Sequence, residues 1–146
     1  MAAPNTDPIY SRVGDVSTNG TTGMSQAITA AANDFTGAGA NNVLVFTADA
    51  TNGGFVQRLR FKSAGTNVAS VARVFINNGS ANTTATNNTF IGEVALPATT
   101  SAAAGTTGPD IDYPLNFPLN PGFKIYVGLG TAVAAGWFVT PVGAKY

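Results

Sequence analysis

The sequence contains neither cysteine nor histidine, and charged residues make up only 10% of its 146 positions. Without cysteine the chain has no disulfide framework, no thiolate zinc site and no cysteine nucleophile. Without histidine it lacks the commonest general base and metal ligand. No apolar run approaches the roughly 20 residues that a membrane-spanning helix needs. We therefore expect no enzyme activity, no cofactor, no metal and no membrane partner.

The few charges cancel, since seven acidic residues face seven basic ones. A general nucleic-acid binder is normally strongly basic, so we expect no nucleic-acid partner. A neutral, weakly charged surface also gives a free monomer little protection against association, which favours a protein that works in an assembly. The length predicts a single domain, residues 1–146.

Threonine, asparagine, glycine and proline recur throughout the chain, a composition that favours strands and turns over helices. One segment, Ser25–Phe35, is ambiguous because its alanines would also support a helix, and we predict a strand there. The predicted strands are Ile9–Val13, Gln26–Ala32, Asn42–Ala48, Gly54–Ser63, Ala69–Asn77, Thr89–Leu96, Ile111–Leu115, Phe123–Gly130 and Gly136–Val142. Eight or nine short strands at this spacing predict an antiparallel sandwich, a jelly roll or a barrel.

The region Thr47–Gly79 is the most informative part of the chain. In its first strand Phe55, Gln57, Leu59 and Phe61 alternate with Val56, Arg58, Arg60 and Lys62, and in its second strand Arg73 alternates with Ala72, Val74 and Ile76. Alternation of this kind predicts one buried and one outward face. We predict a core face of Phe55, Leu59, Phe61, Val74 and Ile76. The opposite face carries four of the seven basic residues and is either a solvated sheet face or a docking surface for an acidic partner.

The segment from Ile111 to Leu119 alternates strictly between apolar and other residues, which predicts another half-buried strand. Pro114 and Pro118 cannot donate to a sheet ladder, so the strand should lie at a sheet edge or leave the sheet part-way. Asp110 and Asp112 should share one face of it. We interpret them as solvated residues at a strand entry, with a cation site as the alternative.

The start of the chain, MAAPNTDPIYSRVG, lacks the basic and apolar segments of a secretory signal, so we expect a cytoplasmic site of synthesis. Residues 1–23 contain two prolines and few apolar groups at their beginning, and we predict an extended N-terminal arm. No nucleophile-and-base pattern and no phosphate-binding glycine motif occurs in the sequence.

Several segments together resemble a group of small proteins encoded among the virion genes of tailed bacteriophages. They are TADATNGGFVQRLRFKSAGT, VARVFINNG, GEVALP and LNPGFKIYVG. The resemblance covers most of the chain after about residue 40, and its motifs include Thr47-Ala48, Asn52-Gly53 and Pro121-Gly122-Phe123. It departs at the C-terminus, where a Gly-Gly-Asp-aromatic ending is expected and Gly143–Tyr146 stands instead.

The resemblance implies a jelly-roll capsid decoration or cement protein that is assembled in the bacterial cytoplasm and bound to the capsid surface of the virion. Its partners would be the major capsid protein and copies of itself, most simply as a homotrimer. The residues we predict to contact partners are Ile9, Tyr10, Val56, Arg58, Arg60, Lys62 and Arg73. The alternative is a carbohydrate- or receptor-binding module of a phage fibre or tail, with Tyr126, Trp137 or Tyr146 stacking on sugars.

Overall fold

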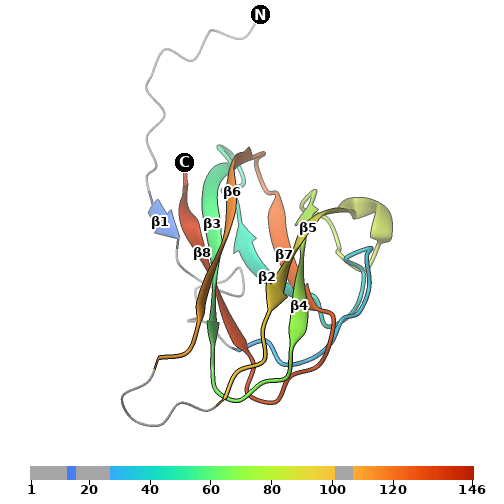
Figure 1. Ribbon diagram of the computed structural model, residues 1–146. Coiled ribbons are helices and arrows are strands. Elements are labelled where there is room, and N and C mark those ends of the chain that lie inside the picture. The colour runs from blue at the N-terminus through green and yellow to red at the C-terminus, as the bar shows by residue number, and fades with distance from the viewer. Residues whose placement is uncertain (1–12, 16–26, 101–106) are drawn as a thin grey trace, which may run out of the picture.

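The computed structural model describes residues 13–15, 27–100 and 107–146, and these residues form an all-β sandwich (Figure 1). The strands are β1 (Val13–Asp15), β2 (Val43–Thr47), β3 (Gly54–Ser63), β4 (Ser70–Asn77), β5 (Asn88–Leu96), β6 (Asp110–Leu119), β7 (Lys124–Leu129) and β8 (Trp137–Lys145). One turn of 3₁₀-helix, η1 (Ala85–Asn87), precedes β5.

The strands form two four-stranded antiparallel sheets, which we call sheet A and sheet B. Sheet A has the order β1-β8-β3-β6 and sheet B the order β2-β7-β4-β5. The first strand pairs with the last, β2 with β7, β3 with β6 and β4 with β5. A long antiparallel ribbon folded over on itself in this way is a jelly roll, so the predicted fold class and the strand count of about eight are confirmed.

One hydrophobic core fills the space between the sheets. Its fully buried large side chains are Trp137, Phe46, Phe61, Leu59, Leu96, Ile125, Leu129, Val45, Val56, Val74 and Val127. The predicted core residues Leu59, Phe61 and Val74 lie in this cluster, and Ile76 packs against it. Phe55, also predicted to be in the core, is only half-buried and lies outside the cluster.

The exception at Phe55 has a local cause. The pairing of β3 with both neighbours shifts in register between Val56 and Arg58. Against β8, Gln57 is an extra residue of β3, whereas against β6 the extra residue lies in β6. A β-bulge of this kind changes which side chains face the core on either side of it. Val56 is 0% exposed and Gln57 is exposed. The prediction that Val56 lies on the surface with the arginines is therefore wrong.

Strand β6 lies at the edge of sheet A and, among the described strands, pairs only with β3, as Pro114 and Pro118 predict. Its apolar residues Ile111, Tyr113, Leu115 and Phe117 pack against the core, and the residues between them are exposed. At the start of β7, the Pro121-Gly122 turn is closed by the Phe123 N–H, which donates to the Asn120 carbonyl over 3.1 Å. Gly122 has φ of 74°, the left-handed conformation that a glycine adopts at this position of a type II turn.

The described part, residues 27–32, of the segment predicted as a strand over Gln26–Ala32 does not join either sheet as a strand. Within it, Ile28 makes an isolated bridge to Trp137 and Ala31 one to Leu129. These contacts carry the chain from the end of sheet A to the outer face of sheet B. A methyl group at Gly128 of β7 would lie 2.9 Å from the Ala32 Cβ, so this segment lies directly against β7. The predicted strand at Ile9–Val13 falls outside the described residues except for Val13, which begins β1.

Candidate interaction surfaces

The four clustered basic residues do not form one face. Strand β3 belongs to sheet A and β4 to sheet B, so Arg58, Arg60 and Lys62 point away from one side of the sandwich and Arg73 from the other. The prediction of a single basic face is wrong. The sequence suggested it because β3 and β4 are neighbours along the chain, whereas β3 pairs with β6 and β8 and β4 pairs with β5 and β7.

On sheet A the basic side chains lie beside the carboxylates of β6, and we call these five residues the charge ladder: Arg58, Arg60, Lys62, Asp110 and Asp112. The closest N–O distances are 3.1 Å for Arg60–Asp112, 3.2 Å for Lys62–Asp110 and 3.5 Å for Arg58–Asp112. Their side chains are 34–53% exposed. Exposed ion pairs are screened by water and contribute little, so the ladder sets the charge of this face more than its stability.

Asp110 and Asp112 thus share one face of β6, as predicted, but their carboxylates form ion pairs with the basic side chains of β3. The hydrogen bond and charge of Arg60 lower the pKa of Asp112, and the same contact raises the pKa of the Arg60 guanidinium. Both groups therefore remain ionised around neutral pH. Among the described residues no group of three or more carboxylates is placed to hold a metal ion.

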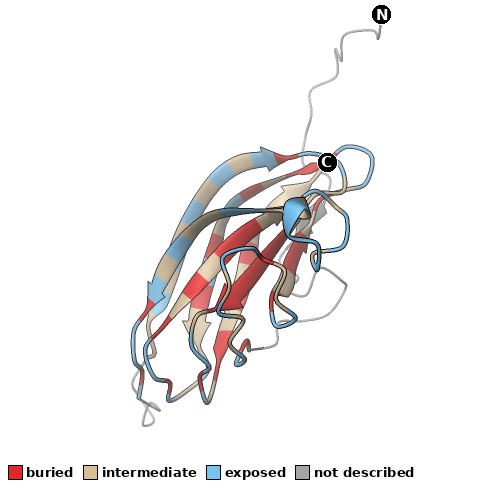
Figure 2. Ribbon diagram, turned by 90° about the vertical axis from the view of Figure 1, so that its right-hand side faces the viewer, coloured by how far each residue is buried: buried red, intermediate tan, exposed pale blue. Residues whose placement is uncertain are grey.

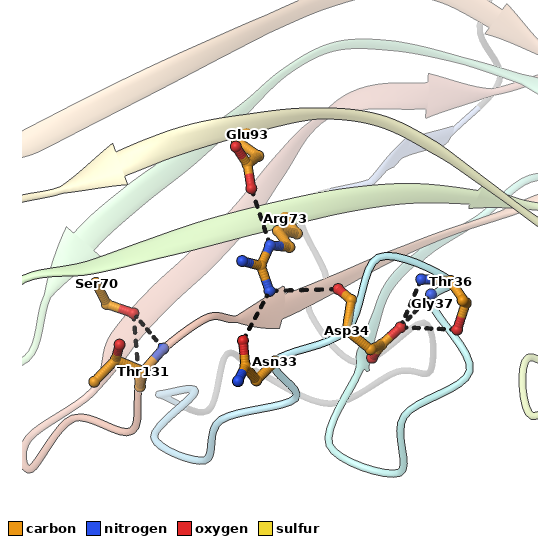
Figure 3. Close-up of polar contacts among 8 residues, drawn as sticks. All are labelled: Asn33, Asp34, Thr36, Gly37, Ser70, Arg73, Glu93 and Thr131. Carbon is orange, nitrogen blue, oxygen red and sulfur yellow. Dashed lines mark hydrogen bonds and ion pairs between the residues drawn. The ribbon is translucent and has the colours of Figure 1, made fainter.

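On sheet B, Arg73 is the centre of a denser cluster (Figure 3). Its side chain is only 12% exposed, and its Nε lies 2.9 Å from the Glu93 Oε1 on β5. Its Nη1 donates to the Asn33 side chain over 3.3 Å and to the Asp34 carbonyl over 3.5 Å. The guanidinium carbon also lies 3.9 Å from the ring centre of Phe35. Arg73 therefore holds the segment around residues 33–35 against the sheet and is not a free cation.

The Asp34 carboxylate organises the next part of this segment. It accepts hydrogen bonds from the backbone N–H groups of Thr36, Gly37 and Gly39 and from the Asn42 amide, at 2.6–3.2 Å. Partial burial acts to raise the pKa of Asp34, but these hydrogen bonds outweigh it and the pKa is lowered. One ionised carboxylate thus fixes the loop that covers the outer face of β4.

Two phenylalanines form an exposed apolar area at this loop, and we call Phe35 and Phe90 the aromatic patch. Phe35 is 60% exposed and Phe90 is 39% exposed. Their rings meet edge-to-face with centroids 5.7 Å apart, and Phe90 also contacts the buried Phe75, 5.6 Å away. Contact with Arg73 and Phe75 holds the patch in a fixed position. Our sequence predictions missed it, because Phe35 stands in a polar stretch and its partner is far along the chain.

Of the other residues predicted to make contacts, some lie outside the described residues and some are buried. Ile9 and Tyr10 lie outside the described residues, as does most of the predicted arm at 1–23. Trp137 and Tyr126, suggested as sugar-stacking residues, are 0% and 8% exposed, so they do not offer a platform for a sugar. Burial also raises the pKa of the Tyr126 hydroxyl.

No protein-family model, curated protein or solved structure matches this chain. The part of the chain that the structure describes holds no helix long and apolar enough to cross a membrane.

Proposed function

We propose that the protein is a non-enzymatic structural component of a bacteriophage virion, a capsid decoration or cement protein. It would bind over the lattice of the major capsid protein in the assembled head and stabilise the shell by added contact area. The virion assignment depends on the resemblance that covers most of the chain after about residue 40, and jelly rolls are common among viral capsid domains.

The observation that carries the proposal is the aromatic patch. Aromatic side chains and arginine are enriched at protein interfaces, and here the Arg73 guanidinium lies against the exposed ring of Phe35. The patch is held by Phe75 and Arg73 on a rigid sheet, so little conformational entropy would be lost when a partner covers it.

Titration of the purified protein onto phage heads that lack it tests the proposal. We expect saturable binding and a higher temperature of head disruption. The double variant Phe35→Ser/Phe90→Ser should lose both effects. Val68→Ser is the matched control, because Val68 is an equally exposed apolar residue, 58% accessible, outside the patch. Failure of the wild-type protein to bind, or equal binding by the patch variant, would reject the proposal.

A separate variant tests whether the charge ladder faces a partner or solvent. Arg58→Glu/Arg60→Glu reverses two of its charges. If this face meets the capsid, binding should weaken and its salt dependence should change, because charged contacts at an interface act mainly on association rate and salt response. Unchanged binding at low and high salt would assign the ladder to solvent.

A carbohydrate- or receptor-binding module is the second candidate, and one observation favours it. The aromatic patch borders an amide-rich segment, where Asn82 donates to the Gly37 carbonyl and Asn88 to the Asn82 carbonyl. Aromatic rings beside planar amides are suited to sugar rings and their hydroxyl groups. Binding of the isolated protein to host glycans, lost in Phe35→Ser/Phe90→Ser while head binding is absent, would favour this function.

A further inference from the structure

The two long sheet edges on one side of the sandwich are built differently. Strands β5 and β6 run side by side there (Figure 2), and Tyr113 of β6 reaches Gly92 of β5. Strand β6 cannot accept another strand along its length, because Pro114 and Pro118 lack N–H groups and Asn116 has φ of 53°. These are the features by which proteins protect sheet edges from unwanted pairing.

Strand β5 has no residue with a positive φ, although its register against β4 shifts at Ile91, an extra residue that forms a β-bulge. Its sequence, NTFIGEVAL, contains no proline and no lysine or arginine, and it extends over nine residues. Within the described ranges its only strand partner is β4, so the backbone groups on its other side have no strand to pair with. The remaining sheet edges, β1 and β2, are three and five residues long. A long edge without proline or basic side chains is a site for strand addition, here through the residues on either side of the bulge.

We propose that β5 pairs antiparallel with β5 of a second copy of the chain, giving a two-fold dimer with a continuous eight-stranded sheet. The charge of the β5 edge indicates which partner binds it. The one charged residue of β5, Glu93, is neutralised by Arg73 of the same copy at 2.9 Å. The edge is therefore neutral and largely apolar, and it fits another neutral, apolar edge better than an acidic or basic partner.

The two-fold arrangement has a geometric consequence. Adjacent antiparallel strands of one sheet are related by an axis perpendicular to that sheet, so both copies present the outer face of sheet B on the same side. The two aromatic patches would then lie on one surface of the dimer. A dimer could bind a repeating lattice at two points, which raises its apparent affinity without new contacts. This last step depends on the proposed function, whereas the dimer itself does not.

A cysteine scan tests the dimer in the purified protein, since the natural chain has no cysteine. Phe90, Glu93 and Ala95 are exposed positions along β5, and Gln57 on β3 is the matched exposed position in the other sheet. Under mild oxidation we expect disulfide-linked dimers with a clear maximum at one β5 position and at least tenfold less for Gln57→Cys. Yields that are equal at all four positions would overturn the proposal.

A proline pair tests the same contact through the backbone. Neighbouring residues of an antiparallel strand direct their N–H groups to opposite sides, so of Val94→Pro and Ala95→Pro one removes an N–H facing β4 and the other an N–H at the open edge. The variant that keeps the wild-type melting temperature is the edge variant. It should sediment as a monomer where the wild-type protein sediments as a dimer.

A wild-type protein that sediments as a monomer at all concentrations, or as the homotrimer that the resemblance implies, would overturn the inference. Because neither experiment uses phage heads, its failure is distinct from a failure of head binding. If both proline variants unfold, the cysteine scan decides.

Discussion

The carboxylate of Asp34 shows how much of a loop one side chain can fix. It takes hydrogen bonds from several backbone N–H groups of the loop and from Asn42, and the loop in turn lies over β4. The same loop passes so close to Phe75 that a Cβ at Gly37 would be 3.0 Å from the ring. Gly37 also has φ of 72°, which disfavours any other residue there.

The lowered pKa of Asp34 predicts a pH-dependent contribution to stability. Because the folded protein favours the ionised form, this contribution is present above the unfolded pKa of about 4 and is lost as the pH falls through the lower folded pKa. We expect Asp34→Asn to lower the free energy of unfolding by about 1–3 kcal/mol near pH 6. Urea unfolding from pH 6 to pH 2 should show this difference shrinking. A difference that stays constant with pH would contradict the assignment.

The bulge at Gln57 predicts that substitutions at Val56 and Gln57 change the free energy of unfolding by different amounts. Val56→Thr places a hydroxyl in the core and should cost about 1–3 kcal/mol. Gln57→Thr changes an exposed side chain and should stay within about 0.5 kcal/mol of wild type. Urea unfolding of the two variants measures both values. If Gln57→Thr were the more costly change, the strand would lack the bulge.

At the scale of elements, Arg73 connects β4, β5 and the loop at residues 33–42. Arg73→Leu removes its contacts with Glu93, Asn33 and Asp34 and should cost about 1–3 kcal/mol. It should also speed hydrogen exchange of the Gly37 and Gly39 amides, which donate to Asp34. Arg60→Leu is the matched control on the other sheet, where the arginine is exposed, and it should leave these amides unchanged. Equal exchange in both variants would refute the role of Arg73.

The strands themselves could be predicted closely from alternation and turn residues. The bounds of β3 were predicted to the residue, and those of β4 differ by one. Side-chain direction within β3 could not be predicted, because a single extra residue at Gln57 inverts it. The separation of Arg58 and Arg73 into different sheets could not be predicted either. It depends on the pairing of β3 with β6 and β8 and of β4 with β7, and these partners lie far along the chain. The aromatic patch was missed for the same reason, since Phe35 and Phe90 meet only after folding.

For the whole molecule, the single core predicts a single unfolding transition. Trp137 is the only tryptophan and is fully buried within that core. Its fluorescence should therefore report on the same event as the loss of strand signal in circular dichroism. We expect the two urea unfolding curves to coincide within error. Separate midpoints would indicate that the two sheets come apart in steps.

The nested pairing of the strands also affects the order in which parts of the molecule fold. Strands β4 and β5 are joined by the short segment between Asn77 and Asn88. The pairing of β1 with β8, in contrast, places Asp15 opposite Gly143, near the other end of the chain. Closing a longer loop costs more entropy, and folds dominated by distant pairings form slowly. The strand of our proposed dimer contact thus belongs to the earliest hairpin, whose open edge is exposed before the rest of the jelly roll closes. Two nascent chains could meet at β5 before either has finished folding.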